Sequence, residues 1–64
     1  MSLILTPNIS DPDGFYAELI GAHRDLSEEE SLRVSARLVL LLANHVGDRA
    51  VLSQAIRLAR SPAG

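Results

Sequence analysis

The sequence predicts a small all-α protein of three short helices after an extended N-terminal arm. Three observations favour this fold class: helix-capping residues recur along the chain, the apolar residues between them follow helical spacing, and 64 residues leave room for one small domain. We therefore expect a single helical domain over residues 1–64, with helices at about residues 12–24, 28–46 and 49–60.

The arm and the first helix are separated by a strong start signal. Residues 3–9 are expected to be extended, because Pro7 opposes helix formation. Asp11 as the N-cap and Pro12 at the first helical position then begin the helix. Side chains at spacings of three and four share one face, namely Phe15, Leu19 and Ala22. Two glycines weaken this helix by about 1 kcal/mol each relative to alanine, so we expect it to depend on packing.

The second helix carries the most informative feature of the chain. Ser27 followed by Glu30 is a capping box, and Gly47 is expected to end the helix in the left-handed conformation. Between them lies an uninterrupted apolar run, residues 38–43. A helix with one covered face keeps its apolar residues on one stripe. This helix is apolar around most of its circumference, so we expect it to be covered on several sides.

At 100° per residue, the second helix has a narrow polar strip and a broad apolar side. The strip contains Glu30, Arg33, Arg37 and Asn44. The apolar side, expected to form the core with Leu42 at its centre, contains Leu32, Ala36, Leu38, Val39, Leu42, Ala43 and Val46. Leu40 and Leu41 fall at the edges of the strip, where packing within one chain covers them least. We expect at least one of them to be exposed in the isolated chain and covered in an assembly.

The third helix follows after only two residues, Gly47 and Asp48, so the second and third helices are expected to form a tight hairpin or corner. Asp48 is the expected N-cap. The apolar face comprises Val51, Leu52, Ala55, Ile56, Leu58 and Ala59. The arginines Arg49, Arg57 and Arg60 lie together on the other side.

Charge is distributed unevenly along the chain. Residues 1–32 hold seven of the eight acidic residues, whereas residues 33–64 hold five of the six arginines, and there is no lysine. Arginine suits bidentate pairing with carboxylates, so the two halves are expected to pair within or between chains. With a net charge of −2, nucleic-acid binding is not expected. The alternative hypothesis is a helix-turn-helix regulator whose third helix faces DNA with Arg49, Gln54, Arg57 and Arg60.

No motif indicates catalysis, a cofactor or a metal, and we expect a protein that is not an enzyme. His23 and His45 lie near helix C-termini, where the helix dipole is a sufficient structural reason for them. The absence of cysteine removes disulfides and thiolate chemistry. The six-residue apolar run is far shorter than the roughly 18–20 residues that span a bilayer. The N-terminus lacks the features of a signal peptide, so the expected location is the cytoplasm.

Interaction with another chain is the function that these features favour. A core this small supplies only about 3–5 kcal/mol, and oligomerisation is the remaining source of stability. We expect a small accessory protein, either a homodimer or a subunit that docks through the second helix onto a larger protein. The candidate interface residues are Tyr16, Arg33, Arg37, Leu40 and Leu41.

Three segments together resemble a family of short bacterial proteins classed only as a domain of unknown function. They are Pro7–Tyr16 (PNISDPDGFY), Leu26–Ser31 (LSEEES) and Leu38–Arg49 (LVLLLANHVGDR). Members of that family are often encoded beside flavin-dependent aromatic hydroxylases. The resemblance therefore implies an accessory role with a flavin-dependent monooxygenase as the larger partner, and it carries over no catalytic residue.

Overall fold

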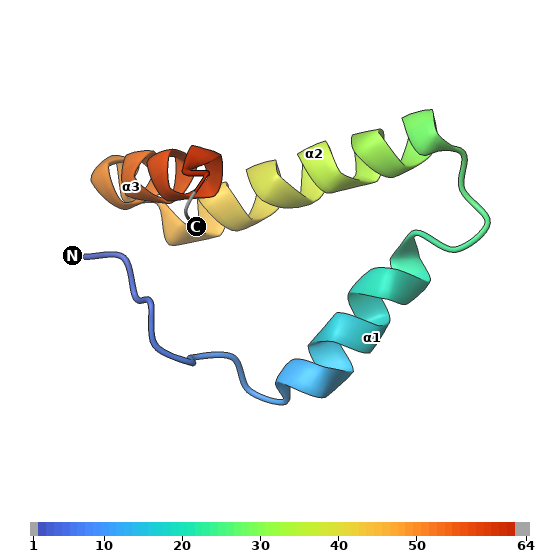
Figure 1. Cartoon of the computed structure of the whole chain (residues 1–64), viewed down its shortest axis with the longest axis horizontal. Coiled ribbons are helices and arrows are strands. Elements are labelled where there is room, and N and C mark those ends of the chain that lie inside the picture. The colour runs from blue at the N-terminus through green and yellow to red at the C-terminus, as the bar shows by residue number, and fades with distance from the viewer. Residues whose placement is uncertain (1, 63–64) are drawn as a thin grey trace.

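The structure, a computed structural model, describes residues 2–62 and contains three α-helices after an N-terminal arm without regular secondary structure (Figure 1). The helices are α1 (Pro12–Ala22), α2 (Glu28–Val46) and α3 (Arg49–Arg60), and the described part of the chain has no strand. The predicted all-α class and the order of elements are confirmed. The first helix ends two residues before the predicted residue 24, because the His23 N–H bonds to the carbonyl of Ile20 and tightens the last turn.

Side-chain caps begin each helix, as the sequence predicted. The Asp11 carboxylate accepts a hydrogen bond from the Gly14 N–H at 3.1 Å. In the capping box, the Ser27 hydroxyl accepts from the Glu30 N–H at 3.1 Å, and the Glu30 carboxylate accepts from the Ser27 N–H at 2.9 Å. The Asp48 carboxylate accepts hydrogen bonds from the N–H groups of Ala50 and Val51, at 3.0 and 3.2 Å. These bonds satisfy N–H groups that a helix leaves without partners.

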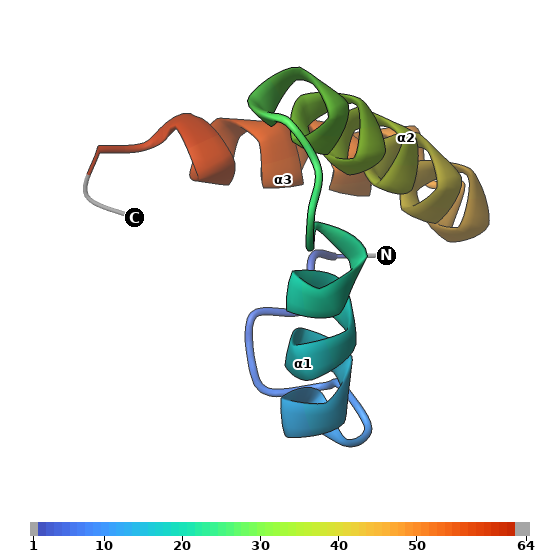
Figure 2. The same ribbon diagram turned by 90° about the vertical axis from the view of Figure 1, so that its right-hand side faces the viewer.

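The turns set the helices at wide angles to one another. Gly47, with φ of 75°, ends α2, and α3 then turns away from α2 to form a corner (Figures 1 and 2). Asp25, with φ of 62°, lies in the turn between α1 and α2, and α1 projects away from α2. The arm returns toward α3, where the Leu3 N–H donates to the Gln54 side-chain oxygen at 3.2 Å.

The helices do not enclose a core. Within residues 2–62, no two helices pack along their lengths, and Val51, 7% exposed, is the only buried residue. The accessible surface is 5804 Å², whereas a compact protein of 6.9 kDa exposes about 4000 Å². The radius of gyration is 13.4 Å, against about 11 Å for a compact domain of this length. The described chain is an open arrangement of capped helices.

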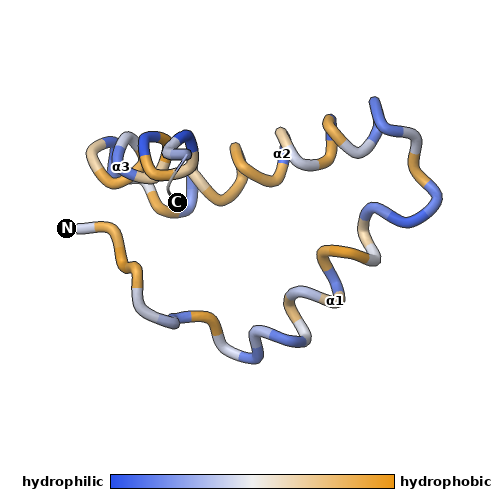
Figure 3. Tube along the Cα trace, viewed as in Figure 1, coloured by the Kyte–Doolittle hydropathy of each residue, from blue (hydrophilic) through white to orange (hydrophobic). Residues whose placement is uncertain are grey.

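The prediction that the apolar side of the second helix forms a buried core is therefore wrong for the isolated chain. Leu42, placed at its centre, is 52% exposed. Apolar residues extend along α2 and through the arm (Figure 3). Large apolar residues exposed elsewhere include Ile4, Leu5, Ile9, Phe15, Tyr16, Ile20 and Ile56. The physical reason is that α1 projects away from α2 and α3 forms a corner with it, so neither helix covers the apolar sides of α2.

Candidate interaction surface

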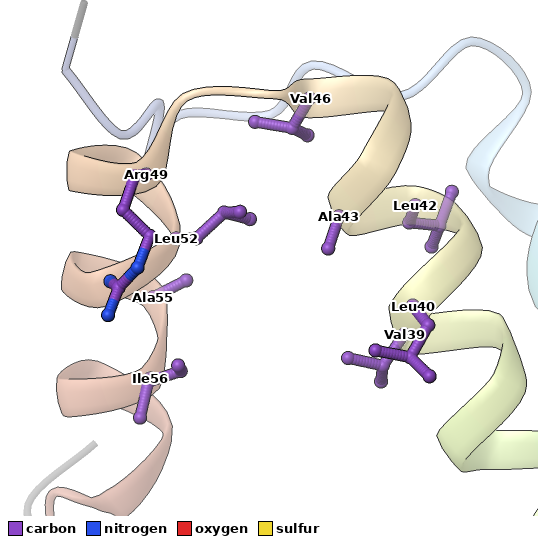
Figure 4. Close-up of a pocket in the computed structure, with 9 residues that line it drawn as sticks. All are labelled: Val39, Leu40, Leu42, Ala43, Val46, Arg49, Leu52, Ala55 and Ile56. Carbon is purple, nitrogen blue, oxygen red and sulfur yellow. The ribbon is translucent and has the colours of Figure 1, made fainter.

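The inner side of the α2–α3 corner is an apolar groove of about 550 Å³. Side chains from the C-terminal half of α2 and from α3 face its open space (Figure 4). This surface, called the α2–α3 groove, is lined by Val39, Leu40, Leu42, Ala43, Val46, Arg49, Leu52, Ala55 and Ile56. Its one charged lining residue is Arg49.

Helical spacing on both sides of Gly47 builds the α2–α3 groove. Val39, Ala43 and Val46 follow one another at spacings of four and three on α2. Leu52 and Ile56 are one turn apart on α3. Because the connection is so short and Gly47 turns the chain sharply, the two rows face each other across the corner (Figure 4).

A second apolar surface lies on another side of α2. It is a shallow depression of about 270 Å³ lined by Val34, Arg37, Leu38 and Leu41, and we call it the Leu41 surface. At 100° per residue, its centre lies roughly 160° around the helix from the row of Val39, Ala43 and Val46. Two separate apolar sides on one helix are what the uninterrupted run of residues 38–43 requires.

The five candidate residues are distributed over different surfaces. Leu40, 69% exposed, lines the α2–α3 groove, while Leu41, 68% exposed, lies beside Arg37 on the Leu41 surface. The prediction that at least one of these leucines is exposed in the isolated chain is confirmed for both. Arg33 forms an ion pair with Glu29, with 3.5 Å between the charged atoms.

Tyr16 is 64% exposed on α1, and within residues 2–62 it makes no hydrogen bond to Arg33 or Arg37. The structure thus brings Arg37 and Leu41 together and leaves Tyr16 on another element. The sequence placed Leu52 and Ile56 on the apolar face of the third helix, but these groove residues of α3 were not among the predicted interface residues. The two-residue connection formed by Gly47 and Asp48 was the signal that the two apolar rows would meet at a corner.

Among residues 2–62, one ion pair, between Glu29 and Arg33, joins the acidic half of the chain to the basic half. Arg57 and Arg60 on α3 have no ion-pair partner among residues 2–62, and neither do Asp13 and Glu18 on α1. Arg49 donates instead to the Ser53 hydroxyl. Asp13 and Glu18 on α1, and Arg57 and Arg60 on α3, are therefore available for pairing with another chain.

The histidine in the turn after α1 has a structural contact. His23 Nδ1 lies 2.9 Å from the Leu19 carbonyl oxygen, and because a carbonyl only accepts, this nitrogen donates. His23 Nε2 lies 3.1 Å from the Ser35 hydroxyl and so links the end of α1 to α2. Residues 2–62 contain no cluster of three or more side chains suited to holding a metal ion. No helix in this part of the chain has the length and apolar character needed to cross a membrane.

Residues 3–61, which include all three helices, match the family described as "Protein of unknown function (DUF2783)". The chain belongs to this family. No curated protein and no solved structure gives a significant match to this DUF2783 chain. The resemblance to a family of unknown function is confirmed, and the family description names no activity. A function for the DUF2783 chain therefore has to be argued from its surfaces.

Proposed function

We propose that this DUF2783 protein is a non-catalytic interaction protein that docks its apolar helical surface, centred on α2, onto another protein chain. The observation that carries the proposal is the exposure of most of the large apolar side chains of α2 in a chain whose helices are all capped. Covering one such side chain contributes about 1.5–3 kcal/mol. Contiguous exposed apolar patches on soluble proteins commonly mark interaction sites.

The Leu41 surface has the composition of a protein-binding site. Its apolar residues surround Leu41, and Arg37 stands at its edge. Arginine is enriched at binding hot spots and forms bidentate bonds with carboxylates. This combination favours a partner that presents an apolar patch beside an aspartate or glutamate.

A flavin-dependent oxygenase is the first larger partner to test. The sequence resembles proteins that are often encoded beside flavin-dependent aromatic hydroxylases, and a small subunit without its own catalytic motif suits an accessory role there. In this proposal, the Leu41 surface docks on the outside of the oxygenase and contributes no reacting group.

The test compares variants of the tagged chain in complex formation with a flavin-dependent aromatic hydroxylase from the same organism. The wild-type chain should co-elute with the enzyme in size-exclusion chromatography at a fixed ratio, and Leu41→Glu should not, because a charge buried in an interface is costly. Helicity, followed by circular dichroism, should be retained since glutamate is a good helix former. Ala50→Glu adds the same charge at an exposed position of α3 and should leave the complex intact.

Two results would overturn this assignment. If Leu41→Glu still co-elutes with the enzyme as the wild type does, the docking surface is not on this side of α2. If both Leu40→Glu and Leu41→Glu lose their helicity, the two leucines stabilise the fold of the chain and do not serve a partner.

DNA binding is the second candidate function, and the arginines of α3 are the observation that supports it. The helix carries Arg49, Arg57 and Arg60 and no acidic residue. A binder that uses them should bind a DNA duplex in fluorescence anisotropy with an affinity that falls steeply between 50 and 200 mM salt. We expect no such binding at micromolar concentration, because the net charge is −2. Salt-dependent binding that Arg57→Ala weakens would favour the regulator over the accessory protein.

A further inference from the structure

The α2–α3 groove is beyond the reach of the α1 of the same chain. Residues 23–27 connect α1 to α2. If α1 folded back antiparallel to α2, Ala22 would lie opposite Glu28, and Pro12 would reach about Leu38, because both helices rise 1.5 Å per residue. The groove begins at Val39 and continues onto α3. A helix from another chain is therefore the natural occupant.

Charge excludes the simplest symmetric arrangement, in which two such grooves face each other. That contact would bring Arg49 of one copy toward Arg49 of the other, and α3 itself contains no acidic residue to compensate them. Like charges placed together in an interface cost binding free energy.

The acids of α1 make it the complementary surface. Four apolar side chains, the α1 stripe, lie on one side of this helix: Phe15, Tyr16, Leu19 and Ile20. On the helical projection, Asp13 lies about 20° from Ile20, and Glu18 lies on the opposite margin of the stripe beside Phe15. Arg49 and Arg60 border Ile56 in the same way on α3. An apolar stripe with acidic margins thus matches an apolar groove with a basic margin.

The area is sufficient for a stable dimer. One chain exposes 5804 Å², and a compact particle of two 6.9-kDa chains would expose only about 6,600 Å². Pairing could thus remove at most roughly 5,000 Å² in total, which exceeds the roughly 1,200–2,000 Å² of a standard stable interface. Because a twofold dimer uses the same patch on both copies, each chain supplies one groove and one stripe.

We propose that the α2–α3 groove of each chain binds the α1 stripe of a second copy, reciprocally, in a twofold homodimer. The proposal rests on the proposed function, since it takes the apolar surface to be an interface. It leaves the Leu41 surface free for the larger partner. The turn at Asp25 and the His23–Ser35 hydrogen bond hold α1 so that it projects away from α2 (Figure 1). A projecting helix can reach the groove of a second copy.

Cysteine cross-linking tests which surfaces meet, and the chain has no native cysteine to interfere. Chains carrying Ile20→Cys and chains carrying Ile56→Cys are mixed and oxidised. A covalent heterodimer should dominate on non-reducing gels. Ala17→Cys lies outside the α1 stripe, about 60° around the helix from Ile20, and, mixed with Ile56→Cys, should give at least about tenfold less. Equal yields from both pairs, or cross-linking of Ile56→Cys chiefly to itself, would overturn the proposal.

Sedimentation equilibrium separates this proposal from the proposed function. The wild-type chain should be a dimer at micromolar concentration, Ile20→Glu should be a monomer that still binds the oxygenase, and Ala17→Glu should remain a dimer. A wild-type monomer that binds the oxygenase would overturn the exchanged dimer and leave the accessory role intact. A chain that neither pairs with itself nor binds the enzyme would contradict both.

Discussion

At the scale of single residues, Gly47 determines how the two longest helices meet. Its φ of 75° lies in the left-handed region, and its N–H donates to the Ala43 carbonyl at 2.9 Å to close the end of α2. Asp48 caps α3 immediately afterwards. A side-chain carbon added at Gly47 would come no closer than 3.9 Å to the Asn44 carbonyl oxygen. Space is therefore not the constraint at this position, and backbone conformation is.

We predict that Gly47→Ala lowers the free energy of unfolding by about 1 kcal/mol, because the left-handed conformation is unfavourable for residues with a Cβ atom. Gly47→Asn is the matched variant, since asparagine tolerates this conformation better, and it should cost less. Urea unfolding followed by circular dichroism at one fixed protein concentration measures both values. Equal losses for the two variants would show that the α2–α3 corner does not require a left-handed residue.

At the scale of elements, the start of α2 combines a capping box with three acidic residues in the first turn. The Ser27 N–H, followed by the Ser27 side chain, holds the pKa of the Glu30 carboxyl below its ordinary value of 4.5. Folding therefore favours the ionised form of Glu30. Its contribution to stability is present above pH 4.5 and is lost as the pH falls through the lower pKa of the folded state.

We predict that Glu30→Gln reduces the loss of α2 helicity on acidification below pH 4.5. The glutamine side chain still accepts a hydrogen bond from the Ser27 N–H, so helicity at pH 7 should change little. Circular dichroism between pH 7 and pH 2.5 compares the two proteins. Ser27→Ala is the contrasting variant and should lower helicity at every pH, because it removes the cap itself. Identical acid transitions for wild type and Glu30→Gln would show that other carboxylates control the effect.

The elements were predictable from sequence because their signals are local. Ser27 and Glu30 are three residues apart, and Gly47 and Asp48 are adjacent, so each cap depends only on its immediate neighbours. The end of α1 was predicted too far along because no capping residue marks it. The exposure of Leu40 and Leu41 was also predictable, since helical periodicity places them at the margins of the polar strip. The meeting of Arg37 with Leu41 follows from the same periodicity.

The α2–α3 groove and the missing core were not predictable in the same way. Whether Leu42 is buried depends on the path of α1, and that path is set by the turn at Asp25 and by the contact between His23 and Ser35. Neither the turn at Asp25 nor the His23–Ser35 contact can be predicted from the spacing of apolar residues along α2. The expected pairing of acids with arginines is found within the chain for Glu29 and Arg33, whereas within residues 2–62 Arg57 and Arg60 pair with none of the acids.

At the scale of the whole molecule, the chain is more open than a compact domain of its length. Its accessible surface of 5804 Å² leaves only about 40% of the unfolded surface buried, whereas a compact chain of this size buries about 60%. Conformational entropy opposes folding by at least about 1 kcal/mol per ordered residue. A chain that buries only Val51 within residues 2–62 has little to set against that cost. Stability is therefore expected to depend on association.

We predict that the thermal midpoint of the wild-type chain rises by about 10 °C for each hundredfold increase in protein concentration. Mass action over that range contributes about 2.7 kcal/mol to a dimer, and the unfolding entropy of about 130 residues converts this to the stated shift.

Leu42→Ala should lower the midpoint by several degrees at high concentration and by much less at low concentration, because Leu42 lines the α2–α3 groove and is half exposed in the single chain. Leu32→Ala, at an exposed position of α2 outside the groove, should have little effect at either concentration. A midpoint independent of concentration would mean that one chain folds stably without covering its apolar sides, and a large loss for Leu42→Ala in that monomer would place Leu42 in a core after all.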